Sequence, residues 1–114
     1  MRNFKEEEFM MGNENVFHMM DEKLLRLLDQ LRDLVREPLK INSSYRSPTY
    51  NEKIGGSKGS KHMEGIAVDI SCTNSTLRHK IVCEATSLGF TVGVAKTFIH
   101  LDIRDIKHPI IFLY

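Results

Sequence analysis

The chain is organised around the stretch Ser60-Lys61-His62-Met63-Glu64-Gly65-Ile66-Ala67-Val68-Asp69-Ile70, which places an imidazole and a carboxylate seven positions apart. A second histidine, His100, lies in a similar apolar setting, Phe98-Ile99-His100-Leu101-Asp102-Ile103. Two imidazoles and one carboxylate are a ligand set typical of a catalytic zinc, which keeps a fourth position open for water. His62, Asp69 and His100 are therefore candidate ligands of one metal ion.

Strand periodicity predicts the side of the sheet on which these side chains lie. In a strand over 67–72, Asp69 faces away from the aliphatic residues on either side of it. In a strand over 97–103, His100 and Asp102 likewise share the face opposite the aliphatic residues. An isolated histidine is more often a polar surface residue, and an isolated aspartate is more often a cap. Those interpretations weaken when all the candidates lie away from the core.

The rest of the pattern predicts an α+β fold. Leucines at helical spacing predict the clearest helix over 21–36, with Asp21 as its N-cap and Pro38 beyond its end. Further helices are predicted over 48–53 and 75–88. Strands are predicted over the ranges 39–43, 67–72, 90–94, 97–103 and 109–114. We expect one domain over 1–114, in which the helices pack on one face of a small, mainly antiparallel sheet.

The segments between these elements are expected to be irregular. Residues 1–20 are expected to form an arm that packs on the core, with one helical turn at 5–9, and 55–60 is expected to be a flexible connector. Cys72 and Cys83 could be a zinc pair, a disulfide or two buried thiols, and we favour buried thiols because a free cysteine behaves as a small apolar residue.

Composition excludes several classes of partner. The chain has 114 residues and a net charge of +1, so it has no strong field for nucleic acid or an anionic membrane. It has no apolar run near the ~18 residues of a transmembrane helix. The N-terminal stretch is charged and has no apolar signal core, so we expect a chain made in the cytoplasm without a signal peptide. We expect a monomer.

The central motif resembles that of a known group of enzymes. Ser60-x-His62-x-x-Gly65-x-Ala67-x-Asp69 with a distal His100 is similar to the metallopeptidases that cut peptidoglycan peptides. These are the D-alanyl-D-alanine carboxypeptidases and L-alanoyl-D-glutamate endopeptidases, including phage endolysins, whose fold is similar to the hedgehog signalling domain. The block Ser43-Ser44-Tyr45-Arg46-Ser47-Pro48-x-x-Asn51 also resembles the family, and the resemblance covers roughly residues 22–104.

The resemblance implies roles for individual residues. His62, Asp69 and His100 match the zinc ligands. Arg46 matches an arginine that binds a substrate carboxylate or steadies an oxyanion, although a structural ion pair is an alternative. Ser60 matches the motif serine, which hydrogen-bonds the substrate or the ligand loop, and simple capping of the loop is its alternative.

The general base is the point at which this sequence departs from the family. Many relatives carry an acid three residues before the last histidine, where this chain has Thr97. Asp102 is the nearest carboxylate, and we interpret it as the base or as a partner of the ligand His100, with Glu64 as a competitor. The remaining histidines, His18, His79 and His108, are expected at the surface.

The resemblance thus implies a zinc-dependent peptidase that hydrolyses peptidoglycan stem peptides. Its alternative is a non-catalytic, zinc-stabilised module that binds cell wall or belongs to a phage particle. The expected cofactor is Zn²⁺, and the expected place of action is the cell wall after release, in a phage or prophage context.

Overall fold

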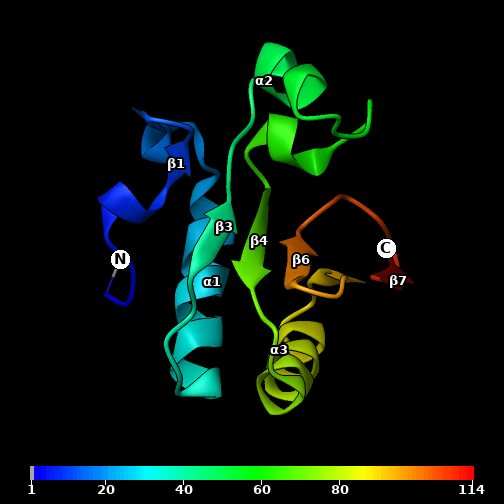
Figure 1. Cartoon of the computed structure of the whole chain (residues 1–114). Coiled ribbons are helices and arrows are strands. Elements are labelled where there is room, and N and C mark those ends of the chain that lie inside the picture. Colours follow the sequence, from blue (N-terminus) through cyan, green and yellow to red (C-terminus); the bar gives the residue numbers. More distant parts are fainter. Residues whose placement is uncertain (1) are drawn as a thin grey trace.

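Helices α1 (Glu22–Val35) and α3 (Ser75–Ser87) pack against one face of a five-stranded sheet in the computed structural model, which describes residues 2–114 (Figure 1). The spatial order of the strands is β3 (Ile41–Ser43), β4 (Ala67–Ser71), β6 (Phe98–Asp102), β5 (Thr91–Val94) and β7 (Ile111–Leu113). The remaining elements are α2 (Pro48–Lys53), the 3-10 helices η1 (Glu6–Glu8), η2 (Phe17–Met19) and η3 (Lys61–Glu64), and the short strands β1 (Met10–Met11) and β2 (Glu14–Asn15). The predicted α+β class is confirmed.

Each helix begins where its capping residue predicts. The Asp21 side chain accepts a hydrogen bond from the Leu24 backbone N–H at 3.0 Å, and Asn74 caps α3 in the same way. Ser47 caps α2, and Pro48 occupies its first turn. Most of the apolar stripe predicted on α1 is buried, which confirms the helical spacing, although Leu34 near the end of the helix is 48% exposed. None of the helices among residues 2–114 is long and apolar enough to span a membrane.

The sheet is antiparallel except at its edge, where β7 pairs in parallel with β5. One face carries the aliphatic side chains of β4, β5 and β6, which form the core with α1 and α3. On the other face, one row of paired residues crosses all five strands. In order across the sheet, this row is Ser43, Asp69, His100, Gly93 and Phe112. Two candidate metal ligands are therefore direct cross-strand neighbours.

The N-terminal arm packs on the core as predicted, since Phe4, Phe9 and Val16 are buried. Its expected irregularity is wrong, because β1 and β2 form a hairpin that turns through the two residues Gly12 and Asn13. Gly12 has a φ of 61°, the conformation that such a tight hairpin turn requires and glycine adopts without strain. The predicted helical turn at 5–9 is the 3-10 helix η1.

The two cysteines are both free thiols, but only Cys72 is buried. The expectation of two buried thiols is wrong for Cys83, which is exposed on α3. The reason is helical geometry. Cys83 lies two positions from each of the buried residues Ile81 and Ala85, and a spacing of two places a side chain on nearly the opposite side of a helix.

The end of the arm and the start of α1 also contact the loop that carries His62. The Asp21 backbone N–H donates to the Gly65 carbonyl oxygen at 2.9 Å. Gly65 has a φ of 72°, and a Cβ at this position would overlap the backbone oxygen of Met19. The absence of a side chain at Gly65 is what lets the arm approach the ligand loop.

Replacing Gly65 with alanine is expected to lower the free energy of unfolding by about 2–4 kcal/mol, because a left-handed conformation costs ~1–2 kcal/mol and the overlap with Met19 adds to it. Gly55→Ala is the matched control, since Gly55 has a φ of 74° but no atom near its Cβ position. Urea denaturation of both variants measures the difference. Equal losses would show that the arm does not constrain the loop.

Candidate metal centre

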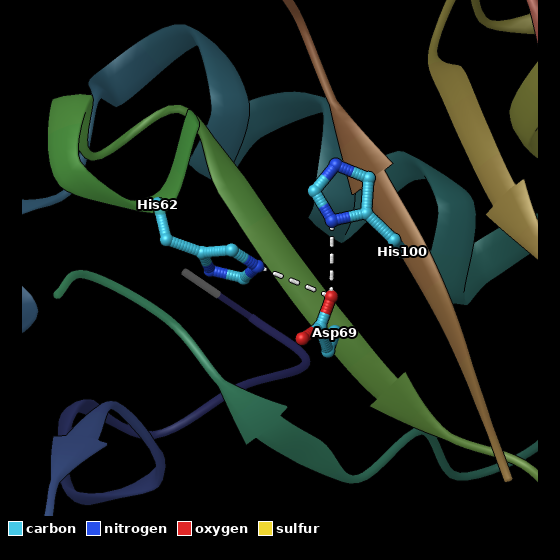
Figure 2. A group of neighbouring side chains, drawn as sticks. All are labelled: His62, Asp69 and His100. Atoms are coloured by element: carbon cyan, nitrogen blue, oxygen red, sulfur yellow. Dashed lines mark hydrogen bonds and ion pairs between the residues drawn. The ribbon is translucent and has the colours of Figure 1, made fainter. Parts of the chain in front are cut away.

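The three candidate ligands come from three separate elements. Asp69 lies in β4 and His100 in β6, while His62 lies in η3, directly before β4 (Figure 2). The Nε2 atom of His62 lies 3.2 Å from Asp69 Oδ1, and the Nδ1 atom of His100 lies 3.1 Å from the same oxygen. One ligand atom from each residue lies within 4.8 Å of the others, and all three residues are buried. The structure therefore brings together the three residues that the sequence singled out.

The outer partners of the two histidines determine which ring nitrogen is free. His62 Nδ1 lies 2.7 Å from the Ser44 carbonyl oxygen, which can only accept, so Nδ1 carries the proton. His100 Nε2 lies 2.7 Å from Asp102 Oδ2, an acceptor that also receives hydrogen bonds from Arg104. In the neutral rings, His62 Nε2 and His100 Nδ1 then present lone pairs to the Asp69 carboxylate.

This arrangement fits a cation. With both rings neutral, the two nitrogen lone pairs and the Asp69 oxygen converge on one point with no donor hydrogen between them. These electron-rich atoms repel one another unless a positive charge lies among them. Zinc bonds of ~2.0–2.1 Å in a tetrahedral arrangement separate two ligand atoms by about 3.3 Å. The observed spacings of 3.1 and 3.2 Å are close to that value. The donor set of two imidazoles and one carboxylate is also one that zinc prefers.

The carboxylates around the histidines are held ionised. Burial raises the pKa of Asp69. In the metal-free protein, the rings of His100 and His62 in their protonated forms donate hydrogen bonds to this carboxylate, which outweigh burial and lower its pKa from 3.8 to about 2. Burial is likewise outweighed at Asp102, where hydrogen bonds from His100 and Arg104 hold the pKa well below its usual range. Both groups are therefore anions at neutral pH, ready to bind a cation or to orient an imidazole.

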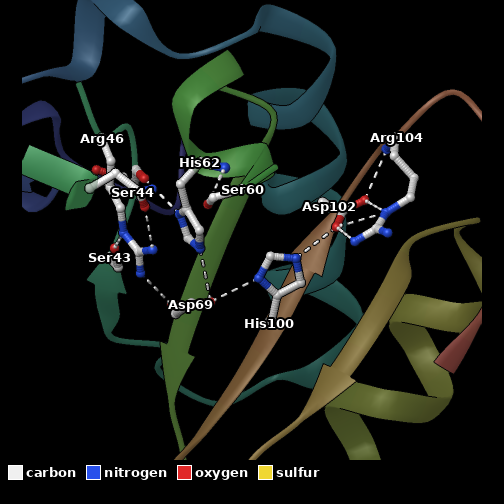
Figure 3. Close-up of polar contacts among 10 residues, drawn as sticks. Ser43, Ser44, Arg46, Ser60, His62, Asp69, His100, Asp102 and Arg104 are labelled. Carbon is white, nitrogen blue, oxygen red and sulfur yellow. Dashed lines mark hydrogen bonds and ion pairs between the residues drawn. The ribbon is translucent and has the colours of Figure 1, made fainter. Parts of the chain in front are cut away.

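Arg46 and Ser60 lie beside the ligands (Figure 3). Arg46 Nη2 lies 3.4 Å from Asp69 Oδ2, and its guanidinium also donates to Ser43 and to Asn51. The backbone N–H of Arg46 donates to the His62 carbonyl oxygen at 3.0 Å. Ser60 Oγ accepts from the backbone N–H of His62 at 3.2 Å and so caps η3. Arg46 thus makes the structural ion pair considered as its alternative, and Ser60 caps the ligand loop.

Asp102 lies on the far side of His100 from Asp69 (Figure 3). Its side chain is fully buried and is held by Arg104, whose Nε lies 2.9 Å from Oδ1 and whose Nη2 lies 2.6 Å from Oδ2. Because Asp102 contacts the ring nitrogen that points away from Asp69, its geometry favours the role of partner to His100 over that of base. Arg104 was not a candidate from sequence. Its position two residues after Asp102, just beyond the end of β6, was the signal that could have identified it.

The other candidates lie away from the ligands. Glu64 is exposed and pairs with Lys61 at 3.2 Å. Thr97, at the family's acid position, is exposed as well. The surface location predicted for the other three histidines is confirmed, since His18, His79 and His108 are all exposed.

A cavity of about 680 Å³ lies over the ligands. On the side of β3 and β4 it is lined by Arg46, by the connector between α2 and η3, and by Lys61 at the start of η3. On the side of β5 and β7 it is lined by Phe112, Tyr114 and Ile110. Of the acidic residues that the structure describes, Asp69 alone lines this cavity. The cavity therefore combines the candidate metal site with Arg46 and Lys61 at one end. At the other end is an aromatic surface, beside which Arg104 is paired with Asp102.

The metal-free protein is expected to be most stable between about pH 4 and pH 6.5. The pKa of Asp69 is lowered, so Asp69 contributes about 2 kcal/mol to the free energy of unfolding above pH 3.8. This contribution is lost as the pH falls towards 2. Burial lowers the pKa of His100, but hydrogen bonds to Asp102 and Asp69 outweigh it and raise that pKa above 6.5. The contribution of His100 to the free energy of unfolding is therefore present below pH 6.5 and is lost as the pH rises through its raised pKa.

Denaturant unfolding of chelator-treated protein across pH 2–8 measures this profile. Asp69→Asn should flatten its acidic side. An Asp69→Asn profile as steep as that of the unaltered protein would contradict the assignment.

Comparison with known proteins connects this geometry to a family. A family model described as Peptidase M15 matches residues 2–102, which include all three candidate ligands. No curated protein matches the chain.

Proposed function

The chain belongs to the peptidase M15 family, a family of zinc peptidases, and we propose that it binds Zn²⁺ through His62, Asp69 and His100 and hydrolyses peptidoglycan stem peptides. The bond cut is that of a D-Ala-D-Ala carboxypeptidase or of an L-Ala-D-Glu endopeptidase of the phage endolysin type. The observation that carries the metal site is the convergence of two imidazole lone pairs and one carboxylate oxygen. The motif from Ser60 to Asp69 supports the substrate class.

The surrounding residues have separate roles in such a reaction. Zinc held by the three ligands would supply a Lewis acid, which activates water and polarises a peptide carbonyl. The Ser44 carbonyl and the Asp102 carboxylate hold the two imidazoles in the orientation that ligation needs. Arg46 lines the cavity with its side chain 15% exposed, so its guanidinium can bind a substrate carboxylate or the developing oxyanion.

The direct test is mass spectrometry of stem peptides after incubation with zinc-loaded protein. We expect release of D-alanine or cleavage between L-alanine and D-glutamate, and the masses of the products identify the bond. Intact peptides after incubation with protein that holds one zinc would rule out hydrolysis of this substrate class. Chelator-treated protein is the control.

The lack of a second cavity-lining carboxylate among residues 2–114 favours one other candidate. A zinc-stabilised module that binds cell wall or a phage component without cleaving it needs no general base. Sedimentation of the zinc-loaded protein with purified cell wall, without release of peptide fragments, would support this candidate over the peptidase.

A further inference from the structure

In the row of paired residues that crosses the sheet, the residue between His100 and Phe112 is Gly93. A Cβ on Gly93 would lie 2.6 Å from Phe112 Cζ and 2.9 Å from Tyr114 Cε2, so the two rings occupy the space that a side chain would fill. They reach across β5 to the metal site. The centroid of the His100 ring lies 5.6 Å from that of Phe112 and 6.3 Å from that of Tyr114.

These rings contact neighbouring side chains but remain open to the cavity. The Arg104 guanidinium lies 5.5 Å from the centroid of Phe112, and Tyr114 packs edge-on against Phe98 at 5.0 Å. Tyr114 nevertheless remains 67% exposed. An aromatic surface that solvent can reach, next to the candidate metal site, offers an apolar group of a ligand a large area against which to bury.

The order of the strands places unlike chemistry at the two ends of the site. Arg46 and Lys61 line the cavity beside β3 and β4, whereas Phe112 and Tyr114 line it at β7, with His100 between them. A ligand that spans the candidate metal site therefore meets Arg46 and Lys61 on one side. On the other side it meets aromatic rings beside Arg104, whose charge is paired with Asp102. An anionic peptide that also bears an alkyl side chain has matching chemistry.

We propose that Phe112 and Tyr114 form a subsite for an alkyl side chain of the substrate residue next to the bond that is cut. This proposal rests on the proposed peptidase function. The family match ends at residue 102, so the subsite comes from a segment outside the matched region.

The test uses two hydroxamates, which bind zinc through the same group and differ only in their alkyl chains. Acetohydroxamate carries a methyl group, and 4-methylpentanoyl hydroxamate carries a longer chain. Calorimetry on zinc-loaded protein is expected to show that the longer compound binds on the order of tenfold more tightly, because it buries additional CH₂ and CH₃ groups against the rings. In Phe112→Ala this preference should fall to about twofold or less, with zinc content and acetohydroxamate affinity unchanged.

Leu113→Ala is the matched control, because Leu113 lies on the same strand but on the opposite face and is 79% exposed. Tyr114→Ala is a second variant, expected to lose part of the preference, and serves if Phe112→Ala does not fold. A preference retained in both ring variants, or absent from the unaltered protein, would overturn the subsite while leaving the peptidase in place. Zinc-loaded protein that bound neither compound would overturn the proposed metal chemistry and the subsite with it.

Discussion

His62→Ala is expected to lose its zinc and all zinc-dependent activity. Removing an outer partner of a metal ligand costs roughly 10–100-fold in affinity, and removing the ligand itself should cost more. The loss should be severe because the proposed site has three protein ligands among residues 2–114, so the variant keeps two. Zinc content after dialysis, and affinity in competition with a chromophoric chelator, measure the effect.

The matched control is His79→Ala, which removes an exposed histidine from α3, away from the three ligands. It should bind zinc as the unaltered protein does. If His62→Ala retained one tightly bound zinc, the converging lone pairs would not be the metal site. If it lost zinc but still cleaved peptide, the metal would be structural and the reaction would proceed elsewhere.

The convergence of the three candidate ligands was predictable because it depends on local periodicity. Alternation along β4 and β6 places Asp69 and His100 on the face opposite the aliphatic residues, and antiparallel pairing then makes them direct neighbours. His62 follows because Ser60 caps a single turn that ends at Gly65, immediately before β4. Each of these features involves only a few consecutive residues, so it can be predicted from a local sequence pattern.

The partners of the ligands were less predictable because they depend on contacts between distant segments. The Ser44 carbonyl reaches His62 from the loop after β3, eighteen positions away in sequence, and backbone atoms have no sequence signature. The same applies to β7. A strand was predicted over 109–114, but no local pattern indicates its parallel pairing with β5. That pairing brings Phe112 over Gly93 and thereby shapes the cavity.

Asp102→Asn is expected to lower zinc affinity by about 10–100-fold. The Asp102 carboxylate accepts the Nε2–H of His100 and so keeps its Nδ1 lone pair directed at Asp69. A neutral amide is a weaker acceptor and can present its NH₂ group instead, which would favour the other tautomer or a rotated ring. The change also leaves the Arg104 guanidinium without its carboxylate, so some loss of folding stability should accompany it.

This variant separates the two roles that the sequence left open for Asp102. If Asp102 only positions His100, saturating zinc should restore most of kcat, and the pH dependence of kcat/KM should keep its shape. If Asp102 is the general base, kcat should remain low at saturating zinc and the acidic limb of the pH profile should disappear.

Glu64→Gln is the parallel test of the competing carboxylate. Because Glu64 is exposed and does not line the cavity, we expect zinc affinity and kcat to be unchanged, and a large fall in kcat would assign the base to Glu64.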